Sequence, residues 1–182
     1  MSSRKNICVF LSSRNISPLA TENIYNFGKK LSKNSFNLVF GGADQPGLMR
    51  QLALGIYDGG GNSTSVIPTC FGWDITKEID KVTTVDNMGE RKHTMMEMSD
   101  AFVVLQGGLG TLDELMEVWT IKLMGGHNKP ILIFTSPSYK AALIQLFQVM
   151  VEEGTAKQEH LDALEWCHSY DDIIQSLKST FS

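Results

Sequence analysis

The chain alternates short apolar runs with longer segments in which apolar residues recur every three or four positions. The short runs are rich in β-branched and aromatic residues, as in buried strands, and the longer segments have the period of one helix face. Strands are predicted at Asn6–Leu11, Asn37–Phe40, Ser63–Ile67, Lys81–Val85, Ala101–Leu105 and Pro130–Phe134. Helices are predicted at Pro18–Lys33, Pro46–Asp58 and Met88–Met98, from Thr111 onward, and at Tyr139–Glu153 and Tyr170–Ser179. Residues 69–80 are predicted to be irregular.

The regular exchange of strand and helix predicts an α/β protein with a parallel sheet covered by helices on both faces. Its 182 residues and 42% hydrophobic content can build one sizeable core, and no repeat or linker divides the chain, so one domain spanning residues 1–182 is expected. Ligands of such sheets bind at the carboxyl ends of the strands. The glycine turns that follow predicted strands lie at that edge.

Charge and cysteine usage exclude several classes of function. Lys+Arg 16 against Asp+Glu 20 gives a formal charge of -4, and no dense basic block occurs, so extended binding of nucleic acid is disfavoured. No segment approaches the roughly 20 apolar residues of a membrane span. The three cysteines are far apart, which suggests neither a disulfide framework nor a metal site, and the histidines lack metal-ligand spacing. A cytoplasmic protein without a metal is expected.

The turn Gly107-Gly108-Leu109-Gly110-Thr111 joins a buried strand to a helix. Free backbone N–H groups at that helix start, together with the positive end of the helix dipole, suit an anion such as a phosphate. The turn is not the dinucleotide fingerprint, because Asp113 stands where a third glycine or alanine is required, and the chain has no P-loop lysine. A phosphate cradle for a mononucleotide or sugar phosphate remains, although glycines also occupy such turns for steric reasons alone.

Thr111 and Glu114 have the spacing of a capping box, in which the threonine caps the helix and the glutamate reaches back to the cap. Alternatively, Glu114 offers its carboxylate to a reacting sugar beside a bound phosphate ester. Such a group stabilises an oxocarbenium-like transition state or orients water. The sequence alone leaves both interpretations open.

Two further segments are candidates for anion binding. Arg91 and Lys92 stand at the start of a predicted helix, where a positive charge is unfavourable by about 0.3 to 1 kcal/mol unless an anion is near. Arginine also grips phosphate or carboxylate in a bidentate manner. Gly41 and Gly42 follow the second predicted strand and Ser13 follows the first, so all three lie at the same edge of the sheet.

Taken in order, Gly41-Gly42 with Gly47-Leu48-Met49, Glu90-Arg91-Lys92, and the turn from Gly107 to Glu114 resemble the LONELY GUY (LOG) family of cytokinin riboside 5'-monophosphate phosphoribohydrolases. The resemblance covers nearly the whole chain. It implies a Rossmann-like three-layer α/β/α fold, a homodimer or larger assembly, no cofactor, and hydrolysis of an N6-modified AMP to free base and ribose 5-phosphate. By position, Arg91 and Glu114 correspond to the catalytic pair. The residues that correspond to the phosphate cradle and its surroundings are Ser13, Gly41, Gly42, Lys92, Gly107, Gly108, Gly110 and Thr111.

The chain departs from the family pattern where Gln106 replaces a signature proline and where Gly89 replaces a common histidine. These changes leave the catalytic positions intact and bear on substrate preference. Family members are often described as lysine decarboxylases, but the sequence shows no context for a pyridoxal phosphate lysine. Two rival functions use the same fold: a nucleotide or molybdenum cofactor carrier, which needs no carboxylate, and a DNA-processing role, which the acidic composition disfavours.

Overall fold

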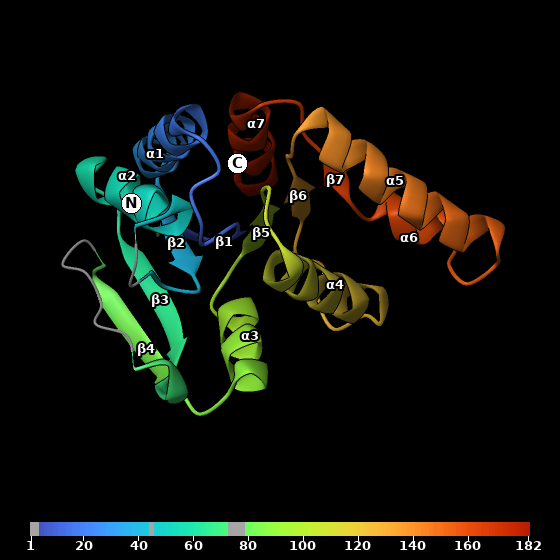
Figure 1. Cartoon of the computed structure of the whole chain (residues 1–182), viewed down its shortest axis with the longest axis horizontal. Helices are drawn as coiled ribbons and strands as arrows, with labels where there is room; N and C mark the ends of the chain where they lie inside the picture. Colours follow the sequence, from blue (N-terminus) through green and yellow to red (C-terminus); the bar gives the residue numbers. More distant parts are fainter. Residues whose placement is uncertain (1–3, 44–45, 73–78) are drawn as a thin grey trace.

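The computed structural model describes residues 4–43, 46–72 and 79–182. Seven strands form one sheet in the order β4-β3-β2-β1-β5-β6-β7, and every pairing is parallel (Figure 1). The strands are β1 Lys5–Phe10, β2 Phe36–Phe40, β3 Ser63–Pro68, β4 Lys81–Val85, β5 Ala101–Val104, β6 Ile131–Ile133 and β7 Glu165–Trp166.

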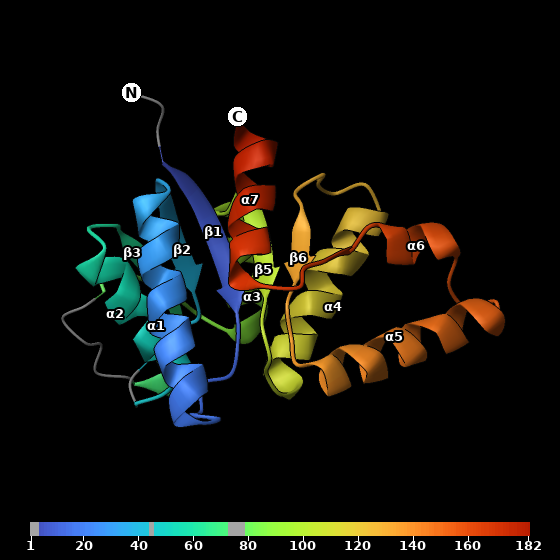
Figure 2. The same ribbon diagram turned by 90° about the horizontal axis from the view of Figure 1, so that it is seen from above.

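Helices cover both faces of the sheet and give three layers (Figures 1 and 2). One buried cluster joins the sheet to α1, α2 and α7, and a second joins the opposite face to α3, α4 and α5. The helices are α1 Pro18–Lys33, α2 Leu48–Asp58, α3 Met88–Glu97, α4 Leu109–Leu123, α5 Pro137–Glu152, α6 Gln158–Asp162 and α7 Tyr170–Phe181, with a 3-10 turn η1 at Thr69–Phe71. The Rossmann-like three-layer α/β/α prediction is confirmed.

Alternating burial explains how one strand supplies both cores. In β1, Ile7 and Val9 pack with α1, α2 and α7, while Cys8 and Phe10 pack with α3, α4 and α5. Successive side chains of a strand point to opposite faces, and a strand covered on both faces is therefore apolar throughout. Phe10 stacks on Phe102 of the neighbouring β5, with ring centroids 5.9 Å apart.

Each predicted strand and helix is present, with boundaries shifted by a few residues. The short elements α6 and β7 were not predicted, and residues 73–78 of the predicted irregular stretch lie outside the described residues. The predicted start of α4 at Thr111 is wrong, because the helix begins at Leu109. Among the residues that the structure describes, no helix is long and apolar enough to cross a membrane.

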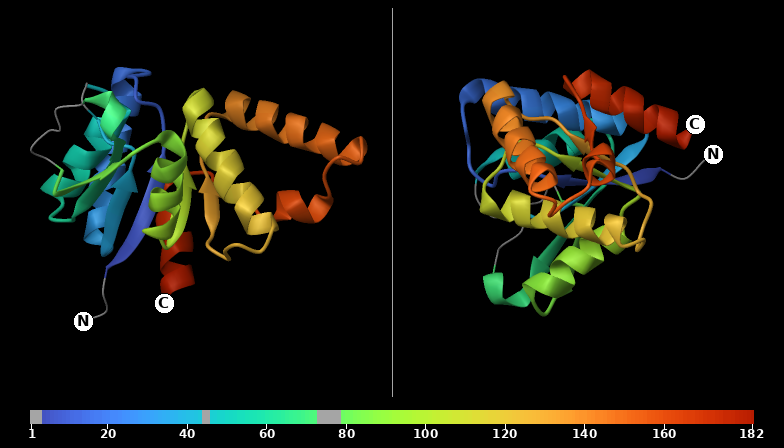
Figure 3. Two further views of the ribbon diagram at one scale, coloured as in Figure 1. Left: turned by 90° about the horizontal axis from the view of Figure 1, so that it is seen from below. Right: turned by 90° about the vertical axis from the view of Figure 1, so that its right-hand side faces the viewer.

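The direction in which successive strands are added to the sheet reverses between β1 and β5. From β1 the chain proceeds to β2 on one side, and from β5 it proceeds to β6 on the other. The helices that leave these two central strands, α1 and α4, therefore lie on opposite faces (Figure 3). The crevice that they leave at the carboxyl ends of the strands is where such sheets bind ligands.

Candidate active site

A cleft of about 610 Å³ opens at the carboxyl ends of β1 and β5. The loop after β1 forms one wall, and the first turn of α4 forms another. Arg91 of α3 and Glu114 of α4 line it together with apolar side chains from α2 and η1. Its lining residues are Leu11, Ser12, Ser13, Arg14, Met49, Phe71, Arg91, Gly108, Leu109, Gly110, Thr111 and Glu114.

Arg91 is held in the cleft wall by the capped start of α3. The Asn87 side chain accepts the Glu90 N–H at 2.9 Å, and the Glu90 carboxylate accepts the Asp86 N–H at 2.8 Å. These two bonds fix the first turn of α3 against the residues that precede it. Arg91 lies one residue beyond Glu90 and points inward, with only 6% of its surface exposed. Its Nε donates to the Val66 carbonyl at 3.1 Å, and its Nη1 donates to Glu114 Oε1 at 3.1 Å.

Glu114 is the partner of this buried guanidinium and is itself only 6% exposed. Burial raises the pKa of the Glu114 carboxyl to about 7, although the charge and hydrogen bond of Arg91 act to lower it. A carboxyl with a pKa near neutrality is present in both protonation states under physiological conditions. It can therefore stabilise a developing positive charge or transfer a proton.

The start of α4 excludes the capping-box interpretation of Thr111 and Glu114. Gly108 is the N-cap residue and supplies no side-chain cap, while Thr111 lies inside the first turn. The carboxylate of Glu114 bonds Arg91 rather than its own helix. A capping box of Thr111 and Glu114 is therefore not formed. The first helical bond runs from the Leu112 N–H to the Gly108 carbonyl, which leaves the preceding N–H groups of the turn without helical acceptors.

The glycines of this turn divide into two kinds. A Cβ on Gly107 would lie 2.0 Å from Thr111 Oγ1, so the fold itself requires glycine there. A Cβ on Gly108 or Gly110 would meet nothing within 4 Å, and neither residue has a positive φ. The protein interior gives no steric reason for these two glycines. They keep open the part of the cleft beside the free N–H groups.

Gly41 leaves space for the Arg91 side chain. A Cβ added there would lie 1.6 Å from Arg91 Nη2, so the guanidinium occupies the space that a side chain would need. Gly42 has a φ of 82°, and a Cβ there would lie 2.8 Å from Ile67 Cδ1. Both glycines are buried, and neither lines the cleft. In this structure, Gly41 packs against Arg91 and Gly42 packs against Ile67, so both act on the site through the residues behind the cleft.

The remaining predicted residues lie at different distances from the cleft. Ser13 lines it, and Thr111 lines it as a buried residue. Lys92 does not line it. Its ammonium pairs with Glu117 and, at 3.0 Å, with Asp113, and these two carboxylates raise the Lys92 pKa. Lys92 therefore links α3 to α4.

Two polar residues of the site were not identified from the sequence. Arg14 lines the cleft and adds a positive charge, and its position directly after Ser13 was an available signal. Tyr139 of α5 donates its hydroxyl to the Gly107 carbonyl at 3.0 Å. Because the N–H and C=O of a trans peptide point in opposite directions, this bond orients the Gly108 N–H away from Tyr139. No local sequence pattern connects residues 32 positions apart.

The fold and the cleft define an α/β protein with an open amide turn and a buried Arg–Glu pair at its switch point. A family model described as "Possible lysine decarboxylase" matches residues 49–177. The probable cytokinin riboside 5'-monophosphate phosphoribohydrolase LOG6 of Arabidopsis thaliana is 38% identical over 153 residues, or 82% of this chain and 76% of that protein. The chain belongs to the LOG family.

One further relative agrees with this assignment, and one solved structure shows the same fold. The probable phosphoribohydrolase LOG4 of Oryza sativa subsp. japonica is 35% identical over 156 residues, and the match spans 82% of this chain and 66% of that protein. The molybdenum cofactor binding protein of Rippkaea orientalis has the same fold, with a TM-score of 0.76, 18% identity and complete coverage of both chains. At that identity the likeness concerns the fold alone.

The decarboxylase description of the family does not fit the cleft. A pyridoxal phosphate enzyme needs a lysine whose pKa is depressed so that its amine can form a Schiff base. No lysine is among the described residues that line the cleft. The neighbouring Lys92 has a raised pKa and two carboxylate partners.

Proposed function

We propose that this protein is a phosphoribohydrolase that cleaves the N-glycosidic bond of AMP-type nucleoside 5'-monophosphates, including N6-modified ones, to free base and ribose 5-phosphate. The observation that carries the proposal is the buried pair of Arg91 and Glu114 in the same cleft as an open turn of backbone amides. The names of the relatives supply the reaction.

The 5'-phosphate would bind at the first turn of α4. Its oxygens accept from the free N–H groups there, where Gly108 and Gly110 leave room and the helix dipole favours negative charge. Arg14 and Ser13 on the facing loop add a charge and a hydroxyl. The cleft then holds two arginines against one carboxyl group, which suits an anionic substrate.

The base would lie against the apolar part of the cleft, formed by Met49, Phe71 and Leu109. Leu109 is 87% exposed, and an apolar side chain so placed at the mouth of a cleft gains from covering a flat ring. Ribose then extends between the base and the phosphate. This arrangement directs the anomeric carbon toward Glu114 and Arg91.

In the reaction, the electron pair of the C–N bond leaves with the base while water attacks the anomeric carbon. The ionised Glu114 carboxylate stabilises the positive charge that develops on the ribose ring and accepts a proton from the attacking water. The departing base takes up a proton from solvent, and Glu114 releases the proton of the attacking water to solvent, so that one water is consumed in all. Arg91 orients the carboxylate through its 3.1 Å bond and contacts the ribose or the phosphate.

The test is release of free base from AMP and from N6-isopentenyl-AMP, followed by chromatography, with ribose 5-phosphate assayed as the second product. Arg91→Ala and Glu114→Gln should each lower the rate by about 10²-fold or more, because each removes a group that acts in the transition state. Absence of base release from every nucleoside monophosphate tested would overturn the proposal. A tight complex with intact nucleotide, unaffected by Glu114→Gln, would indicate a carrier instead.

We also propose a homodimer or larger assembly in a reducing compartment such as the cytoplasm. Two apolar residues at the end of α4, Leu123 and Met124, are 39% and 82% exposed, and such neighbours often mark a subunit contact. The cysteines Cys8, Cys70 and Cys167 are all free thiols. Light scattering after gel filtration measures the mass, and a monomer at micromolar concentration would contradict the assembly.

A further inference from the structure

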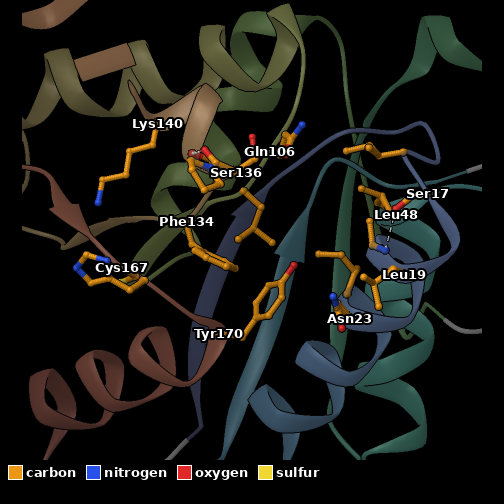
Figure 4. Close-up of a pocket in the computed structure, with 17 residues that line it drawn as sticks. Ser17, Leu19, Asn23, Leu48, Gln106, Phe134, Ser136, Lys140, Cys167 and Tyr170 are labelled. Carbon is orange, nitrogen blue, oxygen red and sulfur yellow. Dashed lines mark hydrogen bonds between the residues drawn. The ribbon is translucent and has the colours of Figure 1, made fainter. Parts of the chain in front are cut away.

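A second cavity, of about 600 Å³, opens at the same edge of the sheet but among α1, α5 and α7. Figure 4 shows it between Ser17, the N-cap of α1, with Leu19 of α1, on one side and Lys140 of α5 on the other, with Tyr170 of α7 below. Gln106, directly before the glycine turn, forms part of its wall. The candidate active site has a different set of lining residues, so the two cavities are distinct.

One side of this second cavity is apolar. Ile16 and Leu19 are 47% and 67% exposed, and both line the cavity with Leu48. The floor is aromatic, because Phe134 and Tyr170 meet edge to face with centroids 4.8 Å apart. A hollow of this volume with apolar walls lies within the range of small-molecule sites.

Two polar side chains that line the cavity have no hydrogen-bond partner among the residues that the structure describes. The hydroxyl of Tyr170 is directed into the open space in Figure 4. Within the described part of the chain, neither this hydroxyl nor the side-chain amide of Gln106 has a hydrogen bond to the protein. A polar group left facing an apolar hollow gains from a ligand that supplies a partner.

The opposite side of the cavity carries the positive charge of Lys140. Lys140 and His168 line it, and the Lys140 ammonium lies 5.3 Å from the centroid of the Trp166 ring, with no carboxylate partner among the described residues. Three acids lie nearby, and none of them lines the cavity. Asp171 pairs with Lys30, Asp172 accepts the backbone N–H of His168, and Glu165 lies close enough to Cys167 to act to raise its pKa.

We propose that this cavity binds a small amphiphilic anion. Its hydrocarbon body lies against Leu19, Leu48 and the aromatic floor, its carboxylate faces Lys140 and His168, and Tyr170 donates a hydrogen bond to it. Charge complementarity selects an anion over a neutral or cationic molecule of the same shape. This inference is independent of the chemistry at Glu114.

The experiment compares three probes with the same phenylbutyl body: 4-phenylbutyrate, 4-phenylbutanol and 4-phenylbutylamine. Isothermal titration calorimetry on the full chain measures each dissociation constant. The carboxylate should bind at least about threefold more tightly than the alcohol, as expected for one partly exposed charge pair, and the amine should bind most weakly. Saturating AMP should leave these constants unchanged because it binds in the other cleft.

Two variants locate the binding. Lys140→Met keeps an apolar stem and should abolish the preference for the carboxylate while the alcohol still binds. Leu19→Asp places an acid in the first turn of α1, where it is favourable for the helix, and should weaken 4-phenylbutyrate most. Lys157→Met, which removes an exposed lysine paired with Glu159, is the matched control and should change nothing.

The proposal is overturned if no probe binds saturably or if the three probes bind equally. It is also overturned if AMP displaces 4-phenylbutyrate, because the probe then occupies the candidate active site. Binding that persists unchanged in both Lys140→Met and Leu19→Asp would place the ligand elsewhere. Circular dichroism of each variant confirms that the comparison is made on folded protein.

Discussion

The substitution Gly41→Ala tests whether the position of Arg91 controls the site. The added methyl would lie 1.6 Å from Nη2 and 2.8 Å from Cζ of Arg91, whereas nonbonded heavy atoms are comfortable at about 3.5 to 4 Å. The guanidinium must therefore move by about 2 Å. Its bonds to the Val66 carbonyl and to Glu114, both 3.1 Å, cannot survive such a displacement.

The expected cost follows from the burial of the pair. Separating a buried ion pair destabilises a protein by about 3 to 5 kcal/mol, and for a chain of this size that corresponds to a fall in Tm of about 10 °C. The pKa of Glu114 should also rise above about 7, because Arg91 lowers it in the native arrangement. Base release at neutral pH should fall about as far as in Arg91→Ala.

A double-mutant cycle separates this mechanism from a general effect of the methyl group. All three of the nearest atoms to the added Cβ belong to Arg91, so Gly41→Ala should cost almost nothing in an Arg91→Ala background. Urea unfolding of the four proteins gives the coupling free energy, which should be about as large as the cost of Gly41→Ala itself. Equal costs in the two backgrounds, or full activity of Gly41→Ala, would refute the reasoning.

Three further predictions concern the cleft. Gly110→Ala should raise the free energy of unfolding by about 0.5 to 1 kcal/mol, since alanine favours a helix and its Cβ meets no atom, yet raise KM about tenfold because the methyl narrows the anion site. A variant whose stability and KM are both unchanged would contradict this. Because burial raises the pKa of Glu114 to about 7, kcat/KM should increase with pH and level off above about 7, and a flat profile would exclude Glu114 as the titrating group. Tyr139→Phe should raise KM about fivefold with kcat nearly unchanged, because it frees the Gly107 carbonyl, whereas Tyr25→Phe, which removes a hydroxyl bonded to Asp58 far from the cleft, is the control. Equal effects of the two tyrosine variants would count against a positioning role for Tyr139.

The sequence predicted the elements that carry strong local patterns. The strand at Ala101 and the glycine turn after it were identified because an apolar run ends at bare glycines. The start of α4 was misplaced because Thr111 has the residue type of a cap, while the true N-cap is Gly108, which offers no side chain to recognise. The two-residue β7 and the five-residue α6 are too short to show a period.

The candidate site was only partly accessible from the sequence. Arg91 and Glu114 are 23 residues apart, and nothing local indicates that they pair, so the family pattern supplied their connection. The sequence placed Gly41 among the phosphate contacts, whereas the structure sets it behind Arg91. Tyr139 could not be found, because its bond to Gly107 depends on how α5 packs beside α4.

The voids at Gly41 and Gly107 are each filled by a side chain that belongs to the cleft, Arg91 in one case and Thr111 in the other. In a saturation-mutagenesis screen scored on catalysis, both glycines should therefore tolerate substitution as poorly as Glu114 does, although neither glycine lines the cleft. Redesign of substrate preference in this scaffold should leave these two glycines untouched and vary the loop that carries Arg14.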